Sequence, residues 1–133
     1  MTNMHLMPFL RRVLLFDALT CMTMGVALLL LAAAVEQMLA IPAIVSRAAA
    51  VVLLGFGIGV GYIATRDRLV RPAVHAIIAL NALWAVASAI ALLFGWLTPN
   101  TPGLVFIIGQ AVAVAIIVWL EIIALQRGAR API

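Results

Sequence analysis

Charged residues are scarce in this chain. Only 9% of its 133 residues are charged, namely eight arginines and four acidic residues, and lysine is absent. Soluble domains are about one quarter charged, so this chain lacks the polar groups that would cover a water-facing surface. Hydrophobic residues make up 68% of it, and the mean hydropathy is +1.31. This composition excludes an ordinary soluble domain and indicates an integral membrane protein.

Cysteine is nearly absent as well. Cys21 stands alone, which excludes an intrachain disulfide, a CxxC redox pair and a thiolate zinc site. We expect Cys21 to be a small buried apolar residue rather than a reactive thiol. The sequence has no spacing motif for a metal or a cofactor, and we predict neither. It also has no recognisable catalytic motif and no loop long enough to build a site, so we predict that the protein is not an enzyme.

The positive charge lies outside the apolar segments. The net charge of +4 could suggest a nucleic-acid binder, but seven of the eight arginines lie in the tails or in a central turn over residues 66–71. Arginines in such places determine membrane topology, so we predict membrane lipids and no nucleic acid as partners. The arginines on this side are Arg11, Arg12, Arg66, Arg68, Arg71, Arg127 and Arg130. Since Arg47 alone falls on the other side, we predict that both termini lie in the cytoplasm. The alanine-rich composition with arginine as its only basic residue is typical of bacteria with GC-rich genomes, so we predict a location in the bacterial inner membrane.

Four apolar segments follow one another along the chain. Each is long enough to cross a bilayer as a helix, for which about 20 residues are needed. Together they predict an all-α fold, a single integral membrane domain over residues 1–133, built as a four-helix transmembrane bundle that runs up-down-up-down. In the fourth segment, Thr101 is predicted to cap the helix and Pro102 to occupy its first position. The predicted spans are residues 13–35, 43–65, 73–95 and 103–126.

The second span contains four glycines at alternate positions, which form two overlapping GxxxG pairs. Glycines four residues apart form a flat strip on which another helix can pack closely. We expect the strip to be a helix-packing surface within the bundle rather than a dimer face. Its members are Gly55, Gly57, Gly59 and Gly61.

Each span also places a polar side chain near its arginine-rich end. These candidate ligand or coupling-ion residues are Asp17, Tyr62, His75 and Glu121. Because an ionisable residue within a span is costly unless it is paired or hydrated, three interpretations stay open. The carboxylates could pair with Arg12, Arg66 or Arg71, they could carry a proton or cation, or Asp17 and Glu121 could bind a divalent metal together with His75.

A second polar set is predicted deeper in the bundle. Asn81, Trp84 and Ser88 share one face of the third span. Counted from the cytoplasmic side, Gln110 falls level with Ser88, and Asn81 falls level with Cys21. Interhelical hydrogen bonds at these levels are expected to hold the bundle together. The alternative is a small polar pocket with Trp84 as one wall.

Three segments of the chain carry a resemblance to other proteins. They are RRVLLFDALTCMTMG from residue 11, LNALWAVAS from residue 80 and GQAVAVAIIVWLE from residue 109. These segments resemble a loose group of small four-span bacterial membrane proteins. The resemblance covers about residues 11–127 and implies a fold but no activity. In size and span number the chain is also similar to small multidrug resistance transporters, and more loosely to DoxX-like proteins. The transporters use a carboxylate in their first helix, where Asp17 would stand, although theirs is a glutamate in a different small-residue context.

Two functions follow as expectations. The first is a structural or accessory subunit of a membrane assembly, packed against larger membrane subunits or its own copies as a homo-oligomer. The second is a small proton- or cation-coupled transporter that uses Asp17 and Glu121. Asp17→Asn separates the two, because it would abolish coupling in a transporter but only lower stability in a structural subunit.

Overall fold

The computed structural model describes the backbone of residues 3–5 and 8–130, and the side chains of residues 8–67 and 71–127. Within these ranges the chain forms five helices and one pair of short strands. Strand β1 (Asn3–His5) pairs antiparallel with β2 (Arg68–Val70). The helices are α1 (Pro8–Leu30), α2 (Ala32–Leu39), α3 (Ala43–Ala64), α4 (Arg71–Leu93) and α5 (Thr101–Arg130).

Four of the helices in the described part of the chain, α1, α3, α4 and α5, are long and apolar enough to cross a membrane. The segments that qualify contain 22 to 27 residues, more than the roughly 20 that a bilayer requires. Many of their apolar side chains are exposed, among them Phe16, Leu83 and Trp119, and few are fully buried. Such a surface is stable in lipid and unstable in water, so the chain is a multi-pass membrane protein.

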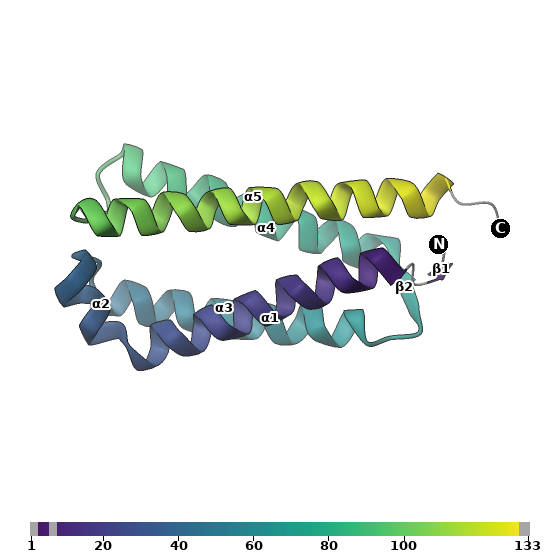
Figure 1. The fold of residues 1–133 in the computed structure, drawn as a ribbon, viewed down its shortest axis with the longest axis horizontal. Coiled ribbons are helices and arrows are strands. Elements are labelled where there is room, and N and C mark those ends of the chain that lie inside the picture. The colour runs from purple at the N-terminus through teal and green to yellow at the C-terminus, as the bar shows by residue number, and fades with distance from the viewer. Residues whose placement is uncertain (1–2, 6–7, 131–133) are drawn as a thin grey trace.

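The helices form two hairpins (Figure 1). Helices α1 and α3 pack closely along their length, and α4 packs on α5. The hairpins meet where α1 contacts α5, and again where the short α2 contacts α5. The strands lie at one end of the bundle, and α2 and the connection between α4 and α5 lie at the other. Near the strand end, the core contains the buried side chains of Leu10, Leu14, Val60, Val74 and Leu125.

The first helix begins five residues before the predicted span and ends at Leu30 rather than at residue 35. Pro8 can open a helix because its missing N–H is not needed in the first turn. The predicted spans assign residues 31–35 to the first helix and leave residues 36–42 between the first two, whereas Ala32–Leu39 form the separate helix α2. The residue after this helix, Ala40, has a left-handed conformation (φ 55°). The Glu36 carboxylate then accepts a hydrogen bond from the Ala43 N–H at 3.0 Å and caps α3.

Asn100 fixes the connection between α4 and α5. Helix α4 ends before Gly95, whose positive φ of 70° is a conformation that suits glycine. Asn100, rather than the predicted Thr101, caps α5, since its side-chain oxygen accepts the Gly103 N–H at 2.9 Å. Its side-chain nitrogen donates to the Met38 carbonyl, and its backbone N–H donates to the Leu39 carbonyl. This residue therefore also ties α5 to the end of α2.

The glycine strip of α3 divides into two faces. A Cβ atom at Gly57 would lie 3.0 Å from the Met22 side chain and 3.2 Å from the Ala18 carbonyl oxygen, and one at Gly61 would also contact Ala18. This pair lets α1 approach α3 closely. A Cβ atom at Gly55 or Gly59 would meet nothing within 4 Å, so this second pair faces outward.

Candidate functional site

Two carboxyl groups and one amide meet in the interior of the bundle. The Asn81 side-chain nitrogen, Nδ2, donates to Asp17 Oδ2 at 2.8 Å and to Glu121 Oε2 at 3.4 Å. All three residues are buried, with exposed fractions of 1% for Asp17, 5% for Asn81 and 0% for Glu121. Because Asp17 Oδ2 and Glu121 Oε2 both accept a hydrogen bond from this nitrogen, the distance between these two oxygens cannot exceed the sum of the two hydrogen-bond lengths. This group connects α1, α4 and α5 and is called the carboxylate cluster below.

The helix boundaries explain why these residues meet. Asp17 lies nine residues after the start of α1, Asn81 ten residues after the start of α4, and Glu121 nine residues before the end of α5. At about 1.5 Å per residue, all three lie about 14 Å from the same end of the bundle. In the predicted spans, Asp17 and Glu121 are closer than Asn81 to the arginine-rich ends of their helices. The reason is that the first predicted span begins after the start of α1 and the last one ends before the end of α5.

The carboxylate cluster contains no basic side chain. The hydrogen-bond partners of the two carboxyl groups in the described ranges are Asn81 and Cys21, whose Sγ donates to Asp17 Oδ1 at 3.5 Å. Arg66 stacks instead over the ring of Tyr62 at 5.1 Å, and Arg11 donates to the Arg66 carbonyl. Glu121 Oε1 is buried without a hydrogen-bond partner. The cluster can therefore accept a further donor or a cation.

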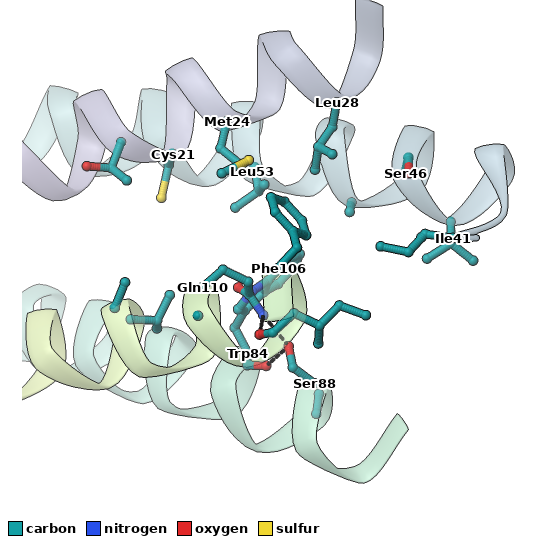
Figure 2. A pocket seen from close by; sticks show the side chains of 18 of the residues that line it. Cys21, Met24, Leu28, Ile41, Ser46, Leu53, Trp84, Ser88, Phe106 and Gln110 are labelled. Atoms are coloured by element: carbon teal, nitrogen blue, oxygen red, sulfur yellow. Dashed lines mark hydrogen bonds between the residues drawn. The ribbon is translucent and has the colours of Figure 1, made fainter. Parts of the chain in front are cut away.

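A cleft of about 590 Å³ lies between the two hairpins. It is lined by residues of α1, α3, α4 and α5, and Asp17 belongs to its lining. Figure 2 shows Cys21, Met24 and Leu28 on one side of this cleft, with Trp84, Ser88 and Gln110 opposite. The volume is in the range of sites that bind one small molecule. Because Asp17 belongs to both features, the carboxylate cluster adjoins the cleft.

The polar residues on the α4–α5 side of the cleft are bonded to each other. Trp84 Nε1 donates to Gln110 Oε1 at 2.8 Å, Gln110 Nε2 donates to Ser88 Oγ at 3.1 Å, and Ser88 Oγ donates to the Trp84 carbonyl at 2.9 Å (Figure 2). The contact between Gln110 and Ser88 agrees with the prediction that these two residues lie at the same depth in the bundle. Because these groups satisfy one another, this set joins α4 to α5 and forms one wall of the cleft.

His75 and Tyr62 are not brought to the carboxylate cluster. His75 is exposed near the start of α4, where its Nδ1 lies 3.0 Å from the Arg71 carbonyl oxygen. Tyr62 is 59% exposed near the end of α3. The alternative of a metal bound by Asp17, His75 and Glu121 therefore has no geometric support. The described residues contain no group of three histidine, cysteine or acidic side chains that could hold a metal ion.

Ser46 belongs to the lining of the cleft, although no pattern in the sequence singles it out. It is 2% exposed and its hydroxyl has no hydrogen-bond partner. A lone serine in an alanine-rich helix is common, and only the three-dimensional arrangement places it in the cleft.

Comparison of the chain with protein-family models, curated proteins and solved structures gives no match.

Proposed function

We propose that this protein is a small proton- or cation-coupled transporter, in which Asp17 and Glu121 bind the coupling ion and the adjoining cleft binds the transported molecule. The observation that carries the proposal is the shared Asn81 nitrogen, which holds two buried carboxyl groups together without a basic partner. Two negative charges in this environment would be costly. A proton or another cation that binds between them removes that cost and gives Glu121 Oε1 its missing partner.

The contact between Asp17 and the cleft supports a link between the ion and the transported molecule. A change in charge or hydrogen bonding at Asp17 alters one wall of the cleft directly. The contacts between the hairpins are also sparser than those within each hairpin. A rocking motion of one hairpin against the other would break the hydrogen bonds that Asn81 and Asn100 make between them, and such motions are how many transporters alternate access.

We further propose a bacterial inner-membrane location, with four helices running up-down-up-down and both termini in the cytoplasm. In support, Arg11, Arg12, Arg66, Arg71 and Arg127 lie at the strand end of the bundle, close to the ends of their helices. Arg47 lies in α3 near the opposite end. Such an excess of arginine favours the cytoplasmic side.

Charge movement in reconstituted membranes tests the proposal without knowledge of the substrate. Proteoliposomes adsorbed on a solid support receive jumps in pH or in Na⁺ and K⁺ concentration, and the resulting transient currents are recorded. The wild-type protein should give currents that Asp17→Asn and Glu121→Gln abolish and that His75→Asn leaves unchanged. If Asp17→Asn and the wild type gave equal currents at equal protein content, the carboxylate cluster would have no part in the coupling mechanism.

A second candidate is the accessory subunit of a membrane assembly. The observation that favours it is the outward face of Gly55 and Gly59, which is open to a further helix. Native mass spectrometry after gentle extraction distinguishes the candidates. Larger unrelated subunits would indicate an accessory protein, whereas a monomer or homo-oligomer with a small bound molecule would indicate a transporter.

A further inference from the structure

The two carboxyl groups of the carboxylate cluster are not equivalent. Both oxygens of Asp17 accept a hydrogen bond, Oδ2 from Asn81 at 2.8 Å and Oδ1 from Cys21 at 3.5 Å. Glu121 receives only the longer bond from Asn81, at 3.4 Å, and its Oε1 is buried without a partner. Hydrogen bonds donated to a carboxylate stabilise its charged form. The negative charge is therefore more stable on Asp17, and Glu121 is the better site for a proton.

A proton on Glu121 can be shared with Asp17. The two side chains are close enough to form a hydrogen bond to each other, in which the protonated carboxyl group of Glu121 donates to the Asp17 carboxylate. Two buried carboxyl groups this close cannot both be ionised without a large cost, so they hold one proton between them. When the proton moves to Asp17, the charge moves to Glu121, and the pair keeps a single negative charge.

Asp17 connects the carboxylate cluster to the cleft. Asp17 belongs to the lining, whereas Glu121 does not and is fully buried. Among the described residues, Cys21 is the one other titratable group of this lining. On the side of the strands lies the apolar core, whose described members carry no titratable group, and the exposed Tyr62 and His75 belong to neither. A proton can thus reach Glu121 from the cleft by way of Asp17.

A metal cation would find few oxygen ligands in the carboxylate cluster. Hard cations such as Mg²⁺ and Ca²⁺ take about six or more oxygens, and transporters commonly supply part of such a set from the backbone carbonyls of broken helices. Here α1, α4 and α5 continue unbroken through Asp17, Asn81 and Glu121, so their backbone carbonyls are used within the helices. The described side chains of the cluster therefore offer two carboxyl groups and one amide.

The Asn81 amide opposes a cation directly. It directs its nitrogen, which is a donor, to both carboxyl groups, and this nitrogen occupies the place of a cation that would bridge their oxygens. The reverse orientation would set the amide oxygen against two carboxyl oxygens with no donor between them. A proton needs no such space, because it binds to a single oxygen.

We propose that the carboxylate cluster binds one proton and excludes metal cations, and that Asn81 sets this selectivity. Glu121 carries the proton, and Asp17 exchanges it with the cleft. This assignment rests on the proposed function, because it names the coupling ion of the same two carboxyl groups. In the exchange, the O–H bond of Glu121 breaks as an O–H bond forms on the Asp17 carboxylate. Asp17 then releases the proton to water that enters the cleft.

Nuclear magnetic resonance of ¹³C-labelled carboxyl groups tests this proposal, because the chain contains only four acidic residues. Labelling of glutamate gives two signals, from Glu121 and the exposed Glu36, and labelling of aspartate gives two, from Asp17 and the exposed Asp67. The protein in lipid is first titrated with acid in choline chloride. At fixed pH, Na⁺, K⁺ or Mg²⁺ then replaces choline at constant ionic strength. Glu121→Gln assigns the signals, and Glu36 and Asp67 serve as internal references.

With acid, the Glu121 signal should move by the larger part of the shift between a carboxylate and a carboxylic acid, and the Asp17 signal by the smaller part. Neither signal should move when a metal cation replaces choline. A Glu121 signal that stays constant over the whole pH range in which the protein is folded would overturn the proposal. A larger shift at Asp17, or a shift of either signal with a metal cation, would do so as well.

Asn81→Asp tests the role of the amide. This variant removes the donor and brings a third carboxyl group from a third helix, so Mg²⁺ should shift the Glu121 signal and bind at least about tenfold more tightly than to the wild type. Asn81→Leu is the matched control, because it removes the amide without adding a ligand and should not respond to Mg²⁺. A folded Asn81→Asp variant that ignores Mg²⁺ would contradict the selectivity assigned to Asn81. If this variant does not fold, the wild-type titrations decide alone.

The titrations involve no gradient and no transport. A protein that binds the proton in this way but gives no currents in proteoliposomes would contradict the proposed function and leave the proton site in place. Currents driven by Na⁺ or K⁺, together with a Glu121 signal that these ions shift, would leave the proposed function in place and overturn the proton site.

Discussion

Asp17 and Glu121 accept hydrogen bonds from the same nitrogen atom, although they lie on the first and last helices of the chain. Asn81 on α4 therefore serves both carboxyl groups at once. This relationship joins the two hairpins inside the bundle and brings together the two acidic side chains buried there. The contact between α1 and α5 thus has a polar group next to the apolar core at the strand end.

Replacement of Asn81 by leucine should destabilise the protein. The change keeps a similar side-chain volume but removes the donor to both carboxyl groups, and buried acceptors left without a partner cost about 1–3 kcal/mol. The free energy of unfolding in a denaturing-detergent titration measures the effect. Combining Asn81→Leu with Glu121→Gln should recover part of the loss, since one buried charge disappears. If Asn81→Leu alone were neutral, the carboxylate cluster would not hold the hairpins together.

The two faces of the α3 glycine strip should respond differently to alanine. Gly57→Ala places a methyl group against Met22 and the Ala18 carbonyl oxygen, and such overpacking costs about 1–3 kcal/mol. Gly59→Ala enters open space and should be neutral or stabilising by up to about 1 kcal/mol, because alanine favours the helix. Thermal denaturation of both variants in the same detergent makes the comparison. A loss at Gly59 equal to that at Gly57 would indicate that a second chain packs on the outward face.

Asn100 should matter more than the neighbouring Thr101. Asn100→Ala removes the cap of α5 and the bond to the Met38 carbonyl, and loss of a cap alone costs about 1 kcal/mol. Thr101→Ala alters an exposed residue in the first turn and should change stability by less than about 0.5 kcal/mol. Hydrogen exchange of the first turns of α5 gives a local measure. Faster exchange in Thr101→Ala than in Asn100→Ala would contradict the assignment of the cap.

Composition and hydropathy predict the four long helices well, because a chain that must satisfy its backbone in lipid has few alternatives to a helix. They do not predict where the helices end, since Pro8 and the residues after Gln126 extend α1 and α5 by local geometry that apolar patterning does not record. This difference of one to two turns separated Asn81 from the two carboxylates in the sequence-based assignment. Ser46 could not be predicted as a cleft residue, because its place in the lining depends on how the two hairpins face each other.

The most direct test of the central claim is infrared difference spectroscopy of the protein in lipid, recorded between low and high pH and between cation-free and cation-containing buffer. Asp17 and Glu121 should contribute carboxyl bands to one of these differences. Asp17→Asn and Glu121→Gln should each remove them, because the two groups act as one unit around Asn81. Glu36→Gln, which alters an exposed carboxylate at the other end of the bundle, should leave these bands in place. Difference bands that persist unchanged in both Asp17→Asn and Glu121→Gln would contradict the account.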